Sequence, residues 1–188
     1  MALASFAQPL TGTKTIPGDY PTFNSAITDL NLQGVGPGGI IFNITAGYVE
    51  TGVAVNITAS GTAASPIVFQ KIGIGNNPKL ISGQGLPGNN YDSIICITGG
   101  DWITFDSFDL EENIANTTVS AVEKAFYINR ASSSNGCHNI TIKNCNISLN
   151  YYNNSSGIFF SDKINATNFN GTNSNNKFFL NIISGCNI

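Results

Sequence analysis

A nine-residue pattern occurs twice in this chain and limits the folds that it can adopt. The segment Trp102–Leu110 (WITFDSFDL) matches Asn139–Ile147 (NITIKNCNI) position by position. A shorter match relates Ile142–Ile147 to Ile183–Ile188 at an offset of 41 residues. Self-similar segments are typical of repeat proteins, in which each repeat packs only against its neighbours. We interpret the last offset as about two turns of a solenoid with repeats of roughly 20 or more residues, with Gly157–Phe160 as the strand of the turn between.

Each copy of the pattern alternates apolar and polar residues, then breaks, then ends in an apolar pair. This order predicts a strand, a sharp bend at Ser107, Asn144 or Gly185, and a second strand. Asn residues at stacked bends are expected to form side-chain ladders. Segments rich in Gly, Pro and Asn separate the other strand candidates. These candidates are Gly39–Ile44, Val53–Thr58, Pro66–Ile72, Ser93–Thr98, Ala125–Asn129, Gly157–Ser161 and Lys177–Ile183. The predicted fold class is therefore all-β, a parallel β-helix.

One helix is expected, within residues 22–31. Gly34 follows this segment as a stop signal. Four apolar residues recur there at helical spacing: Phe23, Ala26, Ile27 and Leu30. An open solenoid end exposes its core and its sheet edges, and a helix can cover both. We predict that residues 13–188 form one β-helix domain with this helix as its N-terminal cap; an ordinary surface helix is the alternative.

The composition favours stacked β-structure and excludes several classes of protein. Charged residues make up only 10% of the chain, whereas Asn occurs 26 times, 18 of them from Asn113 onward. Asn and Gly tolerate the left-handed conformation that sharp turns need. The net charge of −3 and the lack of a Lys/Arg cluster argue against nucleic-acid binding. No apolar run reaches the length of about 18 residues that a transmembrane helix needs.

The two ends of the sequence favour an exported protein that is longer than this chain. Residues 1–12 resemble a signal-peptide remnant, with small residues in Met1–Gln8 but no charged region before them. A disordered N-terminus is the alternative. The segment Cys186–Ile188 falls inside the repeated pattern with no cap after it, which predicts truncation at the C-terminus. The expected location is therefore secreted or at the cell surface.

Few residues of the chain are candidates for catalysis or metal binding. The four cysteines lack metal-ligand spacing and are expected to be core thiols more often than disulfides: Cys96, Cys137, Cys145 and Cys186. His138 is the single histidine, and no carboxylate lies near it in sequence, which favours a turn residue over a catalytic one. Arg130 is the single arginine, and it has no nearby Asp in sequence.

Several segments resemble the pectin-lyase-like superfamily. Tyr20–Ile27, Gly39–Ile44 and Gly47–Glu50 are similar to the helix, strand and turn that open pectin methylesterases. Ala64–Phe69 and Leu80–Gly83 resemble the turns that follow. The run as a whole is most similar to large exported surface β-helix proteins of Bacteroidetes-type bacteria. The resemblance implies a right-handed parallel β-helix outside the cell, and it implies little about activity because this fold hosts many functions.

No complete catalytic site of that superfamily is visible, since the Gln-Asp and Val-Asp-Phe-Ile-Phe-Gly motifs of the methylesterases are absent. An acidic group is the candidate for a Ca²⁺ or substrate site of the lyase type: Asp101, Asp106, Asp109, Glu111 and Glu112. A solvated acidic edge is the alternative interpretation. Glycoside hydrolysis needs two carboxyl groups at a set distance, and the sequence does not decide whether any pair meets it. No other cofactor is expected.

Three aromatic residues are candidates for stacking on sugars: Trp102, Tyr151 and Tyr152. The function that we expect is a non-catalytic extracellular β-helix module that acts as a stalk, an adhesin or a glycan-contacting segment. The partner would then be a polysaccharide or a cell-surface glycan. One alternative is a polysaccharide lyase or hydrolase whose active turns lie outside this chain. Another is a filament subunit that self-associates through solenoid ends.

Overall fold

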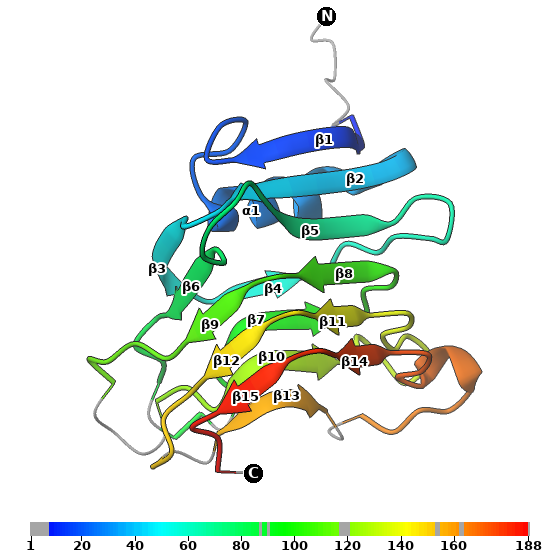
Figure 1. The fold of residues 1–188 in the computed structure, drawn as a ribbon. Coiled ribbons are helices and arrows are strands. Elements are labelled where there is room, and N and C mark those ends of the chain that lie inside the picture. Colours follow the sequence, from blue (N-terminus) through cyan, green and yellow to red (C-terminus); the bar gives the residue numbers. More distant parts are fainter. Residues whose placement is uncertain are drawn as a thin grey trace, which may run out of the picture.

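The computed structural model describes residues 8–86, 88–89, 91–116, 121–152, 155–161 and 164–187. The protein is mostly β-structure, with three parallel sheets and one α-helix (Figure 1). Among the described residues, no helix combines the length and the apolar character needed to span a bilayer. The all-β, parallel part of the predicted fold class is thus confirmed.

The first sheet, sheet A, has the strand order β1-β2-β5-β8-β11-β14. Its strands are β1 (Leu10–Ile16), β2 (Val35–Thr45), β5 (Ile67–Ile72), β8 (Ile103–Asp106), β11 (Thr141–Lys143) and β14 (Lys177–Phe179). Strand β1 begins inside the segment 1–12 that the sequence assigned to a leader or a disordered end. Residues 1–7 of that segment lie outside the described residues.

The other two sheets take their strands from the segments that follow the strands of sheet A. Sheet B has the order β15-β12-β9-β6-β3, and sheet C has the order β13-β10-β7-β4. Sheet B contains β3 (Val49–Val53), β6 (Lys79–Ser82), β9 (Asp109–Glu111), β12 (Asn146–Ser148) and β15 (Ile182–Ser184). Sheet C contains β4 (Val55–Ile57), β7 (Ser93–Thr98), β10 (Lys124–Asn129) and β13 (Ser156–Phe160). The chain therefore runs from sheet A to B to C and back, and we call one such circuit a pass.

The register of the strands confirms one predicted repeat and corrects the other. Thr104 pairs with Thr141, 37 residues later, as the match of Trp102–Leu110 with Asn139–Ile147 predicts. Ile147 pairs with Ile183, 36 residues later, so the offset of 41 residues was wrong. From β5 onward, about 36 residues form one full pass and not two turns. The Gly157–Phe160 segment accordingly lies in β13, the third strand of the same pass.

Sharp bends connect sheet A to sheet B where the pattern breaks. Ser107 and Asn144 have positive φ values of 67° and 56°, as expected of such bends. The third bend is at Leu180, with φ 56°, and not at Gly185 as predicted. The misplacement follows from the wrong offset, because Leu180 lies one pass after Asn144.

Asn side chains do stabilise the stack, but they bond mainly to the backbone. The carbonyl oxygens of Asn173, Asn176 and Asn181 accept hydrogen bonds from main-chain amides of the preceding pass, at 2.8 to 3.0 Å. The amides of Asn176 and Asn181 donate to main-chain carbonyls of that pass. The expected Asn–Asn ladder is thus replaced by Asn bridges between passes, which satisfy backbone groups that the bends leave unpaired.

Helix α1 (Phe23–Gln33) covers one end of the core, beside β1 and β4 (Figure 1). Thr22 and Ser25 form a capping box at its start, and Gly34 ends it with φ 69°. Glu50 accepts hydrogen bonds from the main-chain amides of the first helical turn, at 2.6 and 3.2 Å. Its buried face consists of Phe23, Ala26, Ile27 and Leu30, the four residues that the spacing predicted.

Asn31 on this helix closes the exposed edge of β4. Its amide donates to the carbonyl of Asn56 at 2.7 Å, and its side-chain oxygen accepts from the amides of Thr58 and Ala59 at 2.9 and 3.2 Å. We expect Asn31→Ala to lower the free energy of unfolding by about 1–2 kcal/mol, because three hydrogen bonds disappear. Urea denaturation measures this loss. Asn24→Ala on the exposed face of the helix is the matched control, and an equal effect of both changes would contradict the role of Asn31.

The opposite end of the core lacks such a cover in the described residues. Phe178 and Ile183 occupy register positions whose partners in the preceding pass, Ile142 and Ile147, are buried. Phe178 nevertheless remains 37% exposed and Ile183 47% exposed. Strands β13, β14 and β15 also form the last edges of their sheets. This end is called the open end below.

Candidate functional site

Trp102 stands at the start of β8 in an unusual backbone conformation. Its φ is 54°, a left-handed value that a bulky residue rarely adopts. The backbone is held there by two hydrogen bonds: its amide donates to the His138 carbonyl at 3.0 Å, and its carbonyl accepts from the Ile67 amide at 3.0 Å. The side chain is 37% exposed. Left-handed non-glycine residues cost free energy and are concentrated at functional sites.

The same position of the next two passes is occupied by asparagine. Asn139 and Asn175 lie two residues before Thr141 and Lys177, as Trp102 lies two before Thr104, and their φ values are 57° and 59°. Asparagine adopts this conformation readily. The three residues therefore form a row across the strands, with an aromatic ring at one end and two amides beyond it.

Two hollows flank this row, and both are lined by Trp102, Asn139 and Asn175. The first, of about 180 Å³, lies over the strands of sheet A and adds Thr104, Thr141, Lys177 and Pro66. The second, of about 200 Å³, adds Asp101, His138, Phe169 and Asn170. Aromatic rings beside amides and hydroxyls are the side chains that hold sugars, since they offer an apolar face and hydrogen bonds together.

Arg130, which directly follows β10, bonds to the wall of the second hollow. Phe169, 68% exposed, begins the short 3₁₀ helix Phe169–Gly171. Arg130 donates from Nε to the carbonyl of Gly171 at 2.6 Å. Its Nη1 donates to the carbonyls of Ser161 and Ile164, both at 2.9 Å. The single arginine thus bonds three main-chain carbonyls, one of them in the short helix of this wall.

His138 has a carboxylate partner, contrary to the sequence-based interpretation. Asp101 Oδ1 lies 3.0 Å from His138 Nδ1 and accepts the His138 amide at 2.7 Å. His138 Nε2 lies 3.5 Å from the carbonyl oxygen of Phe169, whose ring packs on the imidazole at 5.9 Å. Both ring nitrogens lie near acceptors, and a neutral imidazole donates to one of the two, which ties His138 to Asp101 or to Phe169. A general base would need a nitrogen free to face the substrate.

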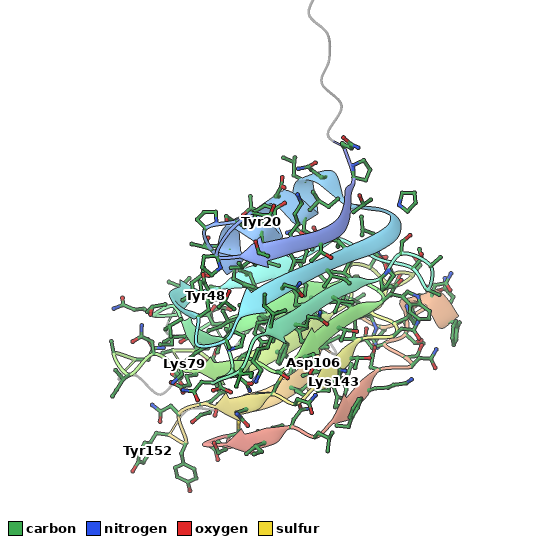
Figure 2. The ribbon with its side chains drawn as sticks, turned by 45° about the horizontal axis from the view of Figure 1, so that its top comes forward. Tyr20, Tyr48, Lys79, Asp106, Lys143 and Tyr152 are labelled. Atoms are coloured by element: carbon green, nitrogen blue, oxygen red, sulfur yellow. The ribbon has the colours of Figure 1, made fainter. Side chains whose placement is uncertain are left out.

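The acidic residues predicted as a Ca²⁺ site do not come together. Asp106 pairs with Lys143 at 2.9 Å on sheet A, and Figure 2 shows these two side chains together. Glu111 pairs with Lys79 at 2.6 Å on sheet B. The other three bond elsewhere: Asp101 to His138, Asp109 to Asn77 and Asn146, and Glu112 to Asn116 and Asn150. Among the described residues no three His, Cys, Asp or Glu side chains form a group that could hold a metal ion. The bend at Ser107 separates them, because it directs the two halves of the segment into different sheets.

We expect Asp106 to contribute to the stability of the fold in a pH-dependent way. Partial burial raises its pKa, but hydrogen bonds from Asn144, Lys143 and Ser107 outweigh this and leave the pKa below its ordinary value of 3.8. A group whose pKa is lower in the folded state stabilises the fold at pH values above its unfolded-state pKa. This contribution is lost as the pH falls through the folded-state pKa. We expect Asp106→Asn to cost less than about 1 kcal/mol at neutral pH, since the group is partly exposed, and nothing at the acid end. Urea unfolding at neutral pH and at a pH below the folded-state pKa measures this cost. An equal cost at both would contradict the lowered pKa of Asp106.

The remaining sequence candidates lie elsewhere. Tyr151 and Tyr152 follow β12, are 65% and 78% exposed, and pack edge to face at 5.6 Å. Neither lines the hollows beside Trp102, and Figure 2 shows Tyr152 projecting from the periphery of the molecule. The cysteines are free, and only Cys137 and Cys145 are buried.

Phe169, Asn170 and Asn175 were missed by sequence reasoning. The signal for Asn175 was its register with Asn139, which the wrong offset concealed. In comparisons with known proteins, no family model, curated protein or solved structure matches this chain. The resemblance to the pectin-lyase-like superfamily therefore stays a prediction from the sequence.

Proposed function

We propose that this protein is a right-handed parallel β-helix of the pectin-lyase-like type that works outside the cell as a non-catalytic, glycan-contacting module. The repeated order of sheets A, B and C supports the β-helix, because each pass from β2 to β13 adds one parallel strand to each sheet. The right hand follows from the general preference for right-handed parallel crossovers. The Asn-rich composition with few charged residues suits a secreted or cell-surface location.

The observation that carries the proposal is the exposed ring of Trp102 between two hollows. Its left-handed backbone places a strained bulky residue where the neighbouring passes carry asparagine. A sugar ring can stack on the indole while its hydroxyls bond to the side chains of Asn139 and Asn175. Hydroxyl-rich ligands suit this lining because amides both donate and accept.

A non-catalytic role is supported by the partners of the charged side chains. Asp101 bonds to His138, and Lys177 is the remaining charged residue that lines the two hollows. General acid–base work on a glycosidic bond uses two carboxyl groups that flank that bond. In the described part of the chain, the lining of the hollows supplies one carboxyl group, that of Asp101, and it is bonded to His138.

Isothermal titration calorimetry against neutral and acidic oligosaccharides, with and without Ca²⁺, tests this function. Release of reducing or unsaturated ends is measured in the same samples. We expect heat of binding without release of ends and without dependence on Ca²⁺. Turnover would contradict the non-catalytic role, and the absence of binding to every oligosaccharide would contradict the glycan-contacting role.

A second candidate, self-association through the open end, is favoured by one observation. Lys177 is the single charged residue among the described residues from 155 onward, so two copies bring few like charges together. Exposed sheet edges and apolar side chains there are a template for further strands. We propose that a second copy covers them. Light scattering should then show a dimer that Phe178→Lys converts to monomer, while a monomeric wild-type protein would contradict this role.

A further inference from the structure

A third hollow, distinct from the Trp102 site, lies on the outer side of sheet C. Its volume of about 490 Å³ is in the range of small-molecule sites, roughly 300–1,000 Å³. Asn56 of β4 and Cys96 of β7 are neighbours in register and form its floor. The segment 83–86, Tyr91 with Asp92, and Val122 form its walls. Among the described residues, it shares no lining residue with the two hollows beside Trp102.

The walls of this hollow are held in place by contacts of their own. The ring of Tyr91 packs against the ring of Tyr127 at 5.7 Å. The Asp92 carbonyl accepts the Lys124 amide at 3.0 Å, which joins this wall to β10. Gly85 has φ 63°, and a Cβ there would lie 1.5 Å from the carbonyl oxygen of Ala121, so the two loops meet through a glycine. A pre-formed site of this kind loses little entropy on binding.

The lining combines apolar surface with hydrogen-bonding groups at its base. Leu86, Val122 and the ring of Tyr91 supply the apolar surface. The side-chain oxygen of Asn56 accepts a hydrogen bond from Thr98 at 2.8 Å, which orients its amide group. A ligand with an apolar body of about one ring in size can therefore contact the lining on several sides.

The charge that lines the hollow is negative. Among the described residues, Asp92 is its only charged lining residue. Its two carboxylate oxygens accept from the Leu86 amide and from the Asn89 side chain, and a carboxylate has about four acceptor positions. Glu123, next to Val122, is 1% exposed; burial first and the charge of Asp92 second raise its pKa. The nearby Lys124 ammonium lies over the ring of Phe159, 4.5 Å from its centroid.

We infer that this hollow binds a small ligand that has an apolar body and one ammonium group. The apolar body lies against Leu86 and Val122, and the ammonium lies beside the Asp92 carboxylate and the Tyr91 ring. Both groups attract cations, one by charge and the other by the negative face of the aromatic ring. A carboxylate on the ligand would meet Asp92 as a like charge, so anions of the same shape are excluded.

Three probes of matched shape test the inference on the whole chain by calorimetry: benzylamine, benzyl alcohol and benzoate. We expect benzylamine to bind most tightly, benzyl alcohol more weakly and benzoate not at all. Asp92→Asn should weaken benzylamine binding about fivefold and leave benzyl alcohol unchanged, because only the charge is removed. Unchanged benzyl alcohol binding also shows that the hollow still forms in the variant.

The thiol of Cys96 gives a second readout that depends on location. In a Cys186→Ser variant, Cys96 is the half-buried thiol that remains, since Cys137 and Cys145 are buried. Benzylamine should slow the alkylation of Cys96 by an uncharged maleimide, and Val122→Phe should remove this protection by filling the hollow. The inference is overturned if benzoate binds as tightly as benzylamine, if none of the probes binds, or if benzylamine binds without protecting Cys96.

Discussion

Replacing Phe69 with alanine should destabilise the protein by about 3–5 kcal/mol, the usual range for a phenylalanine removed from a packed core. Phe69 is fully buried and stacks between Phe42 and Phe105, with both ring centroids at 4.9 Å. It also contacts Phe23 of helix α1 at 5.4 Å. Its removal therefore weakens both the aromatic packing between passes and the packing of helix α1 on the core. Urea denaturation of the variant measures the loss.

Val68→Ala on the same strand is the control. Val68 precedes Phe69 in β5, points to the opposite face of sheet A and is only partly buried. We expect this change to cost less than about 1 kcal/mol, because an outward side chain leaves no closed cavity. Equal losses for the two variants would show that the aromatic stack is not the centre of the core.

Trp102→Asn should weaken glycan binding by at least about tenfold and leave the stability of the fold unchanged or higher. The indole provides the stacking surface, which asparagine lacks. Asparagine also fits a φ of 54° better than tryptophan, and Asn139 and Asn175 occupy the same position in the next two passes. Calorimetry measures the affinity, and thermal unfolding measures the stability.

Tyr152→Ala is the matched control, since Tyr152 is a more exposed aromatic residue outside the hollows. We expect this variant to bind glycans like the native chain. If Trp102→Asn retained binding, or if it lost several kcal/mol of stability as a core change does, Trp102 would be a structural residue instead of a binding residue.

The sequence predicted the β-rich class, the helix and two bends for physical reasons. Alternation with a period of two residues requires strands with one buried face, and the four apolar residues of α1 recur at the helical period. Strand β1 was missed because Leu10–Ile16 consists largely of polar residues that pair with β2 without an alternating pattern. The last pass was misaligned because of a chance match between Cys145-Asn146 and Cys186-Asn187. The true register aligns Leu180 with Asn144.

The site was predicted less well than the fold because its residues come from different passes. Asp101 and His138 are 37 residues apart, so sequence proximity did not reveal the pair. Extending the confirmed match by one residue would have aligned them. The acidic residues illustrate the opposite error: Asp106 and Asp109 are close in sequence, but the bend at Ser107 places one on sheet A and the other on sheet B.

The central claim is that the ring of Trp102 contacts a glycan, and the emission of this residue tests it most directly. Trp102 is the only tryptophan of the chain, so its fluorescence reports on this one site. During titration with a bound oligosaccharide we predict a saturable blue shift and protection from acrylamide quenching, because the sugar displaces water from the indole. Binding seen by calorimetry with no change in the emission or the quenching of Trp102 would contradict the claim.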